Sequence, residues 1–200
     1  MIYDLNEAPP PEAAQGYALC IAGGGVAGIT LARALAGRGR RVLLLEAGGL
    51  AFSAESQEVY GGESLGRSYF ALEETRLRFL GGSSNHWAGW CRPLDAWDFE
   101  RREGMPLSGW PIGKGDLDPF LAPAAEILEI SPDFADRPLE GSGGAFDRIA
   151  FNLSPPVVFG EKYRRELEES RWIDLLRNAN LLALRLAESG GRIAAAHCAN

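Results

Sequence analysis

The sequence contains little cysteine and histidine, and it has no long basic or apolar run. Its three cysteines, Cys20, Cys91 and Cys198, are widely spaced and form no CxxC pair, and only two histidines are present. This set favours neither a disulfide framework nor a zinc site, so we expect no bound metal. The net charge of -7 and the absence of a Lys or Arg block argue against nucleic acid or an anionic membrane as a partner. We therefore expect small-molecule partners.

Segments long enough for membrane insertion or secretion are also missing. No apolar run approaches the roughly 20 residues of a membrane-spanning helix. The first seven residues contain no basic region, and no apolar core precedes the prolines at 9–11. We expect a cytoplasmic protein without a membrane span.

Residues 17–50 show the pattern of a strand, a helix and a second, parallel strand. The nearly continuous apolar run at 17–22 predicts a strand buried on both faces, and the run at 42–45 predicts another. Between them, Gly37 and Gly39 end a helix with one apolar side. The residues of that apolar stripe are Ile29, Leu31, Ala32, Leu35 and Ala36.

The loop between the first strand and the helix carries glycines at a defined spacing. Residues 23–28 read Gly-Gly-Gly-Val-Ala-Gly and fit the GxGxxG pattern of dinucleotide-binding loops. Gly23 permits a tight turn, Gly25 lets the backbone approach a pyrophosphate, and Gly28 lets helix and strand pack closely. N–H groups at the positive end of the helix dipole would face the two phosphates. The strand, helix and strand context favours dinucleotide binding over a purely structural turn.

Glu46 ends the second strand, eighteen positions after Gly28. A carboxylate at about this spacing accepts hydrogen bonds from an adenosine ribose and disfavours a 2'-phosphate. NADP is therefore the least favoured ligand, whereas FAD and NAD share the motif. The residues expected to contact the dinucleotide here are Gly23, Gly25, Val26, Ala27, Gly28, Glu46 and Ala47.

Further motifs follow in order along the chain. They are Asp-Leu-Asn at 4–6, Glu-Ala-Gly-Gly at 46–49, Arg-Phe-Leu-Gly-Gly-Ser-Ser-Asn-His-Trp at 78–87, Ser-Gly-Trp-Pro-Ile at 108–112, Ser-Pro-Pro at 154–156 and Phe-Gly-Glu-Lys-Tyr at 159–163. With these motifs the sequence resembles the N-terminal part of the glucose-methanol-choline (GMC) oxidoreductase family, nearest to its bacterial pyranose-oxidase-like and sugar dehydrogenase branch.

The resemblance implies an α/β fold, a three-layer Rossmann-like FAD-binding domain that is incomplete in this chain. Residues 1–200 would form its N-terminal portion, with the dinucleotide-binding unit at 17–50 and a flavin-side loop at 76–92. Four prolines and several glycines at 131–156 predict an irregular excursion. Apolar runs at 181–186 and 193–198, separated by a glycine turn, predict a late β-hairpin.

The resemblance also implies which residues lie near the flavin. Gly81 and Gly82 would let the backbone approach a flat cofactor, while Ser83, Ser84 and Asn85 could donate to phosphate or flavin oxygens. The full set of expected contacts in this part of the chain is Arg78, Gly81, Gly82, Ser83, Asn85, His86 and Leu182. Arg78 would either neutralise the diphosphate or serve a surface or a salt bridge, and Leu182 would either hold the adenine end or be an ordinary core leucine.

His86 stands where the pyranose-oxidase-like branch attaches its histidine covalently to the flavin. A covalent link, a noncovalent histidine beside the flavin and an ordinary hydrogen-bonded histidine all stay open, because Asn85 replaces the threonine of that branch. The tryptophans Trp90, Trp97, Trp110 and Trp172 are expected to be core or loop anchors.

The implied activity is hydride transfer from the CH–OH group of an alcohol, sugar or polyol to flavin N5. Oxygen, a quinone or a cytochrome could accept the electrons. The family's catalytic His, with its second His or Asn, cannot be placed in this stretch, so we expect no catalytic residue here and the substrate-binding part to be absent. A truncated, non-catalytic FAD-binding protein and an NAD-dependent dehydrogenase are the alternatives.

Overall fold

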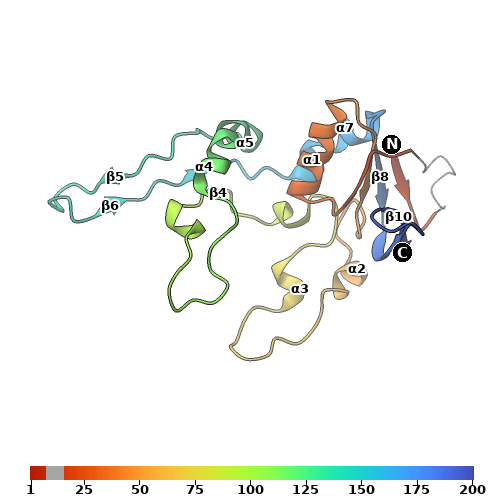
Figure 1. Ribbon diagram of the computed structural model, residues 1–200, viewed down its shortest axis with the longest axis horizontal. Helices are drawn as coiled ribbons and strands as arrows, with labels where there is room; N and C mark the ends of the chain where they lie inside the picture. The colour runs from red at the N-terminus through yellow and green to blue at the C-terminus, as the bar shows by residue number, and fades with distance from the viewer. Residues whose placement is uncertain (8–15) are drawn as a thin grey trace. The chain divides into compact units, whose positions relative to one another are not determined.

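The computed structural model describes residues 1–7 and 16–200 and folds them into two compact units. The first unit combines Met1–His86 with Val158–Asn200, and the second contains Trp87–Val157 (Figure 1). The prolines at 9–11 lie outside the described residues. None of the described helices is long and apolar enough to cross a membrane.

A four-stranded parallel sheet forms the centre of the first unit. Its strands lie in the order β1, β8, β3 and β2, and every neighbouring pair is parallel. The helix α1 (Val26–Ala36) connects β2 to β3, so the predicted strand, helix and strand unit is confirmed. The strand bounds are Ile2–Asp4 (β1), Ile173–Arg177 (β8), Val42–Leu45 (β3) and Leu19–Ala22 (β2).

Different elements cover the two faces of this sheet. On one face Leu44 and Leu175 are fully buried, and α1 approaches so closely that a Cβ on Gly28 would touch Ile21. On the other face Leu45 and Leu176 form a cluster against which Cys198 packs. Cys198 belongs to an antiparallel hairpin of β9 (Asn180–Leu186) and β10 (Ile193–Ala199). Helix, sheet and hairpin give three layers, and both the α/β class and the late hairpin are confirmed.

The structure corrects two expectations about burial. Only Ile21 of β2 is buried, because β2 is the edge strand of the described sheet rather than a strand covered on both faces. Leu31 of α1 is exposed, whereas Ile29 and Ala32 face the sheet. A periodic stripe shows which residues share a helix side, but the width of the contact with the sheet decides which of them are covered.

The sequence pattern missed the central strand β8. Asp174 interrupts the apolar run of this strand, and a short turn is all that separates it from the helix α7 (Arg164–Glu169). The three-residue strand β1 was also missed, because so short a segment carries no periodic signal. Both strands matter for the site, since they add two parallel strand ends to its edge of the sheet.

Short elements complete the first unit. The sequence predicts short helices and loops between residues 51 and 79, and the structure has two short helices there. They and the remaining elements are α2 (Ala54–Glu58), α3 (Leu72–Thr75), the 3-10 turn η1 (Gly82–Asn85) and α6 (Phe159–Lys162).

The second unit consists of short helices and strand pairs. Its elements are β4 (Trp90–Cys91), η2 (Ala96–Phe99), α4 (Lys114–Leu117), η3 (Asp118–Phe120), α5 (Leu121–Leu128), β5 (Arg137–Pro138), β6 (Asp147–Arg148) and β7 (Asn152–Leu153). The stretch predicted to be irregular, 131–156, thus contains three two-residue strands. β5 pairs with β6, and β7 pairs with β4.

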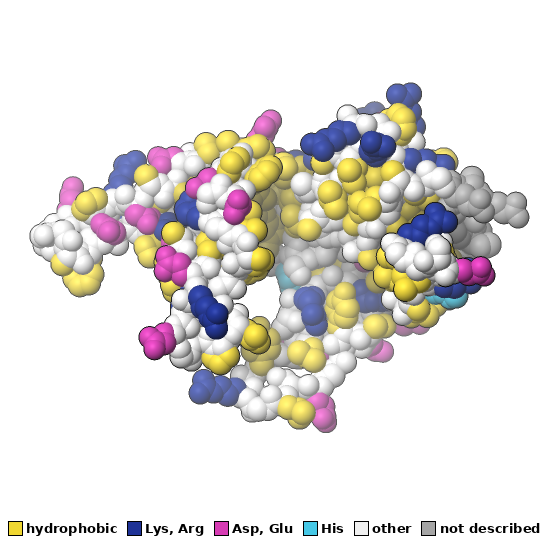
Figure 2. Space-filling view, in the orientation of Figure 1, with side chains coloured by type: hydrophobic (Ala, Val, Ile, Leu, Met, Phe, Trp, Pro, Cys, Tyr) yellow, Lys and Arg dark blue, Asp and Glu magenta, His cyan; other side chains and the backbone are white. Residues whose placement is uncertain are grey.

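Three tryptophans of the second unit are not core residues. Trp90, Trp97 and Trp110 are each more than half exposed, and hydrophobic side chains reach the surface on the face shown in Figure 2. Trp90 meets Phe151 edge to face, and the guanidinium of Arg102 lies over the Trp97 ring. These rings therefore pack at the surface, where they anchor loops rather than fill an interior.

Candidate functional site

The carboxyl ends of the four parallel strands meet at one edge of the sheet. There β2 leads into Gly23, β3 into Glu46, β8 into Asn178 and β1 into Leu5. In open α/β sheets ligands bind at this edge, where loops from different strands come together. The candidate site is therefore built from four segments that are far apart in the sequence.

The loop after β2 has the backbone geometry that the glycine pattern predicts. Gly23 has φ of 106°, a conformation that L side chains rarely adopt. A Cβ on Gly28 would lie 1.9 Å from the carbonyl oxygen of Gly23, so helix and loop pack too closely for any side chain. A Cβ on Gly25 would meet no atom within 4 Å. The space beside Gly25 is open at the start of α1, where Val26 and Ala27 are exposed, so the backbone there is accessible to an anionic group.

Glu46 ties this loop to the one after β3. Its carboxylate is 7% exposed, and it accepts hydrogen bonds from the N–H groups of Gly24 and Gly48, both at 2.8 Å. Each carboxylate oxygen has further acceptor capacity, so these bonds leave Glu46 able to accept from a ribose hydroxyl. A Cβ on Gly24 would lie 2.9 Å from Oε2 of Glu46. The sequence pattern missed this requirement, because Gly24 stands at a variable position of the motif.

The segment after Phe79 docks on the first loop. Gly81 donates its N–H to the carbonyl of Gly24 at 2.8 Å, and it pairs with Gly25 in an isolated parallel bridge. A Cβ on Gly82 would be 3.4 Å from the Cα of Gly25. The two glycine motifs found in the sequence therefore form one continuous surface.

Three polar side chains of this segment differ in what they can offer a ligand. Ser84 is buried; it donates to the carbonyl of Gly81 at 2.7 Å and accepts from the N–H of Phe159 at 3.1 Å. Asn85 donates its amide to the carbonyls of Leu80 and Gly82. These donors support the turn itself, which leaves the exposed Ser83 as the hydroxyl that faces outward.

His86 follows the turn and is exposed. Its backbone N–H donates to the carbonyl of Ser83 at 3.3 Å. Among the described residues no hydrogen bond or ion pair to the imidazole is recorded, so this geometry favours neither nitrogen as the reactive one. The choice between a covalent and a noncovalent histidine stays a prediction.

Arg78 is buried beside a polar cavity of about 590 Å³ at the same edge. Its guanidinium donates to Ser56 and to the side chain of Asn180, and no carboxylate among the described residues pairs with it. The alternative of a salt bridge is therefore wrong for these residues. Two of the five guanidinium N–H groups remain available for a ligand. The residues lining the cavity include Ala47, Gly49, Arg177 and Asn178.

Leu182 lies on β9 with its side chain 68% exposed. It is not a core leucine of the described fold, and it does not line the cavity. A second, smaller cavity of about 390 Å³ lies between the loop at Leu50 and α6, with Asn85 in its wall. Of the sequence-predicted residues, the glycine loops, Glu46, Ala47 and Arg78 thus lie at one edge, and their contacts to a cofactor stay predictions.

Sequence reasoning missed the polar residues that β8 and β1 bring to this edge. Asp4 accepts from the side chain of Asn178 at 2.8 Å and from the N–H of Asn6 at 2.9 Å, and it pairs with Arg177 at 2.7 Å. Burial alone would raise the pKa of Asp4, but these donors and the charge of Arg177 outweigh it and leave the pKa below its usual value. The Asp-Leu-Asn motif was the only sequence signal for this cluster.

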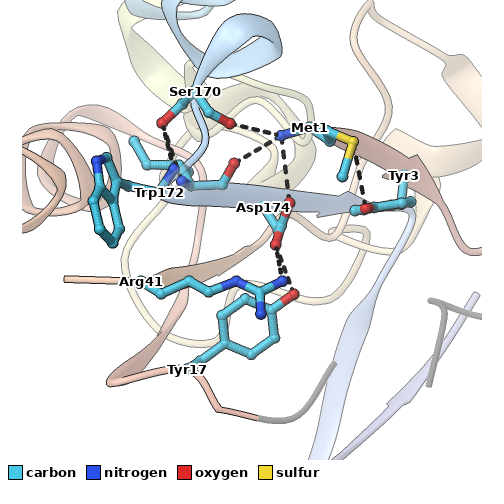
Figure 3. A network of polar contacts seen from close by, with 8 residues as sticks. Met1, Tyr3, Tyr17, Arg41, Ser170, Trp172 and Asp174 are labelled. Carbon is cyan, nitrogen blue, oxygen red and sulfur yellow. Dashed lines mark hydrogen bonds and ion pairs between the residues drawn. The ribbon is translucent and has the colours of Figure 1, made fainter. Parts of the chain in front are cut away.

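A second polar cluster surrounds Asp174 at the amino end of β8. Figure 3 shows Tyr17 and Arg41 both directed at its carboxylate; the hydroxyl of Tyr17 donates at 2.9 Å and Arg41 at 3.0 Å. Burial and the bond to Asp174 raise the pKa of Tyr17 to about 12. The amino group of Met1 also donates to Asp174 at 3.4 Å. This cluster lies at the strand ends remote from the glycine loops, and we assign it a structural role.

Comparisons with known proteins agree with this geometry. The model of the FAD dependent oxidoreductase family matches residues 18–197. Among solved structures, pyridoxine 4-oxidase from Mesorbium loti is similar with a TM-score of 0.54 and 20% identity, over 92% of this chain and 46% of that one. A fungal aryl-alcohol oxidase is similar with a TM-score of 0.52 and 15% identity, over 88% of this chain and 41% of that one. The chain thus spans less than half the length of these structures. No curated protein sequence matches it.

Proposed function

Because the chain belongs to the FAD dependent oxidoreductase family, we propose that the whole protein oxidises the CH–OH group of an alcohol, sugar or polyol in the manner of the GMC enzymes. FAD as the cofactor is established by the family match, and the NAD alternative is not supported. The finer assignment is supported by the order of the GMC-like motifs. Two oxidases that share the fold also support it, because one is a pyridoxine 4-oxidase and the other is an aryl-alcohol oxidase.

One observation carries the proposal, namely the hydrogen bond between Gly81 and Gly24. It joins the GxGxxG loop, which many nucleotide-binding folds share, to the Gly-Gly-Ser-Ser segment that resembles GMC enzymes. A cofactor whose diphosphate lies at the first loop would therefore extend along the second.

Different residues at this edge would contact different parts of the cofactor. Glu46 would accept from ribose hydroxyls, and N–H groups at the start of α1 would hold the phosphates. Arg78 would supply positive charge from the polar cavity beside Ala47. Ser83, Gly81 and Gly82 would lie along the flavin side. When bound, FAD would supply an acceptor for the hydride removed from the substrate carbon.

The test is expression of the complete reading frame and titration with FAD, followed by an alcohol and sugar screen with a dye acceptor. We expect a yellow protein with the absorption of a bound flavin and turnover with at least one CH–OH donor. Oxygen, a quinone and a cytochrome are then compared as acceptors. FAD binding without turnover on any alcohol would contradict the proposed activity but not the cofactor.

The role of His86 is decided in the same experiment. Acid-denatured protein is examined by mass spectrometry, because unfolding releases a noncovalent flavin but leaves a covalently linked one attached to the polypeptide. A mass increase of one FAD that disappears in His86→Ala would establish the link.

A further inference from the structure

We propose that Asp4 is a positioning residue for the edge of the sheet where the carboxyl ends of the strands meet. It holds Asn178 in the backbone conformation that fixes the loop carrying Glu46. The inference rests on the proposed binding of FAD at this edge. Asp4 lies at the end of β1, a strand that the nucleotide-binding pattern does not include.

The carboxylate of Asp4 is largely shielded from solvent and has three polar partners. Its side chain is 8% exposed, and it receives the amide of Asn178, the N–H of Asn6 and the guanidinium of Arg177. The N–H of Leu5 donates to the carbonyl of Arg177 at 3.1 Å and keeps the two segments together. The end of β1 is thereby bonded to the end of β8 and to Asn178, which follows β8.

Asn178 is the residue whose backbone conformation the contacts of Asp4 stabilise. Its φ of 55° lies in the left-handed region, which costs free energy for any residue other than glycine and is tolerated best by Asn and Asp. The bond from its side chain to Asp4 offsets that cost. Without Asp4, the backbone at Asn178 would lose a restraint that holds it in this region.

The turn at Asn178 is bonded in turn to the loop that carries Glu46. The N–H of Asn178 donates to the carbonyl of Gly48 at 3.0 Å, and the N–H of Ala179 donates to the carbonyl of Glu46 at 2.9 Å. The carboxylate of Glu46 then holds the N–H of Gly24. A continuous set of hydrogen bonds therefore runs from Asp4 to the first glycine loop.

The same turn forms part of the wall of the polar cavity. Asn6, Arg177 and Asn178 line it together with Ala47 and Gly49, which follow Glu46. A change in the backbone at Asn178 would alter both the carboxylate that meets the ribose and the cavity beside it. Asp4 would thus affect cofactor binding without touching the cofactor.

The first measurement is the Kd for FAD of Asp4→Ala, determined by flavin fluorescence titration of the full protein. We expect Kd to rise about tenfold, which corresponds to a binding-competent turn at Asn178 that is populated in roughly one molecule in ten without Asp4. Asp4→Asn is measured beside it, because it keeps the side-chain volume and folds even where the smaller side chain does not. It should also weaken binding, since its amide would face Arg177.

A rescue distinguishes positioning from general stabilisation. In Asp4→Ala combined with Asn178→Gly, glycine adopts the left-handed conformation without a partner. We expect the double variant to bind FAD more tightly than Asp4→Ala alone, even though it lacks one more hydrogen-bonding side chain. A purely structural role predicts that the two variants differ in melting temperature but not in their Kd for FAD.

The matched control is Asp174→Asn, which neutralises another buried, arginine-paired carboxylate at the other end of β8. It should lower the melting temperature and leave the Kd for FAD unchanged. The inference is overturned if Asp4→Ala binds FAD like the wild type, if the double variant binds no better, or if Asp174→Asn weakens binding equally. If the wild type itself binds no FAD, the proposed function fails instead.

Discussion

Gly81 donates its backbone N–H to the carbonyl of Gly24 at 2.8 Å, and through this bond two glycine motifs become one surface. A Cβ on Gly24 would lie 3.0 Å from the side chain of Leu80, so the contact favours a residue without a side chain at this position. A Cβ on Gly81 would lie 2.7 Å from the nitrogen of Gly160, so the segment is confined on its other side as well. The following predictions derive from such contacts.

Gly24→Ala and Gly25→Ala should fail in different ways. The new Cβ at Gly24 would displace the carboxylate of Glu46, which lies 2.9 Å away. It should lower the melting temperature without FAD and raise the Kd for FAD. The Cβ at Gly25 meets open space, so the melting temperature without FAD should stay unchanged while the Kd for FAD rises at least tenfold. Equal melting temperatures of the two variants would contradict the distinction.

Gly28→Ala should unfold the protein more readily than any other substitution in α1. Its Cβ would overlap the carbonyl oxygen of Gly23 at 1.9 Å, so we expect a loss on the order of 3 kcal/mol in the free energy of unfolding. Gly37→Ala at the other end of α1 is the control, because its φ is -60° and its Cβ would make an ordinary contact at 3.5 Å. That variant should gain about 0.4 to 1 kcal/mol. Urea denaturation measures both.

Glu46→Gln should reduce stability and FAD affinity together. The amide nitrogen of Gln would face one of the two N–H donors that Glu46 now accepts, which should cost about 1 to 3 kcal/mol in unfolding free energy. The Kd for FAD should rise by roughly tenfold to hundredfold through the weaker bonds to the ribose. Glu166→Gln, which removes a surface pair with Arg33, should change neither quantity appreciably. Titration calorimetry measures the Kd of both variants, and urea denaturation measures their free energies of unfolding.

Tyr17 should make the protein less stable at high pH. Its pKa is raised to about 12 in the folded state from the ordinary value of 10.0, so the folded protein favours the neutral phenol. The stabilisation is complete below pH 10 and is lost as pH rises from 10 towards 12. Melting temperatures across this range should fall more steeply for the wild type than for Tyr17→Phe. Tyrosinate absorbance would record the titration directly.

The sequence alone allowed the dinucleotide-binding unit to be predicted with its residues. Gly23, Gly28 and Glu46 have strong local signals, since a tight turn, a close crossing and a strand-terminal acid each require a particular residue type at a set spacing. The family resemblance added FAD and the segment at Gly81. Because each of these signals lies within a short stretch of sequence, it can be recognised without the tertiary structure.

Other parts of the site have no such signal. Asp4 ends β1, whereas Asn178 and Asn180 follow β8, and these two distant segments meet because β1 and β8 pair in parallel. The apolar pattern of β8 is broken by Asp174, whose burial is possible only because Tyr17 and Arg41 surround it. Pairing of strands far apart in the chain decides these contacts.

The amino-acid sequence by itself determined the glycine loop and the carboxylate Glu46 at the end of β3, because each depends on local backbone geometry, and the family resemblance added FAD as the cofactor. The tertiary structure alone decided that Gly81 lies against Gly24, that Gly24 must lack a side chain, and that Asp4 braces the turn at Asn178. The physical reason is the same in all three cases. Hydrogen bonds and steric limits between distant segments exist only after the strands have packed into one sheet.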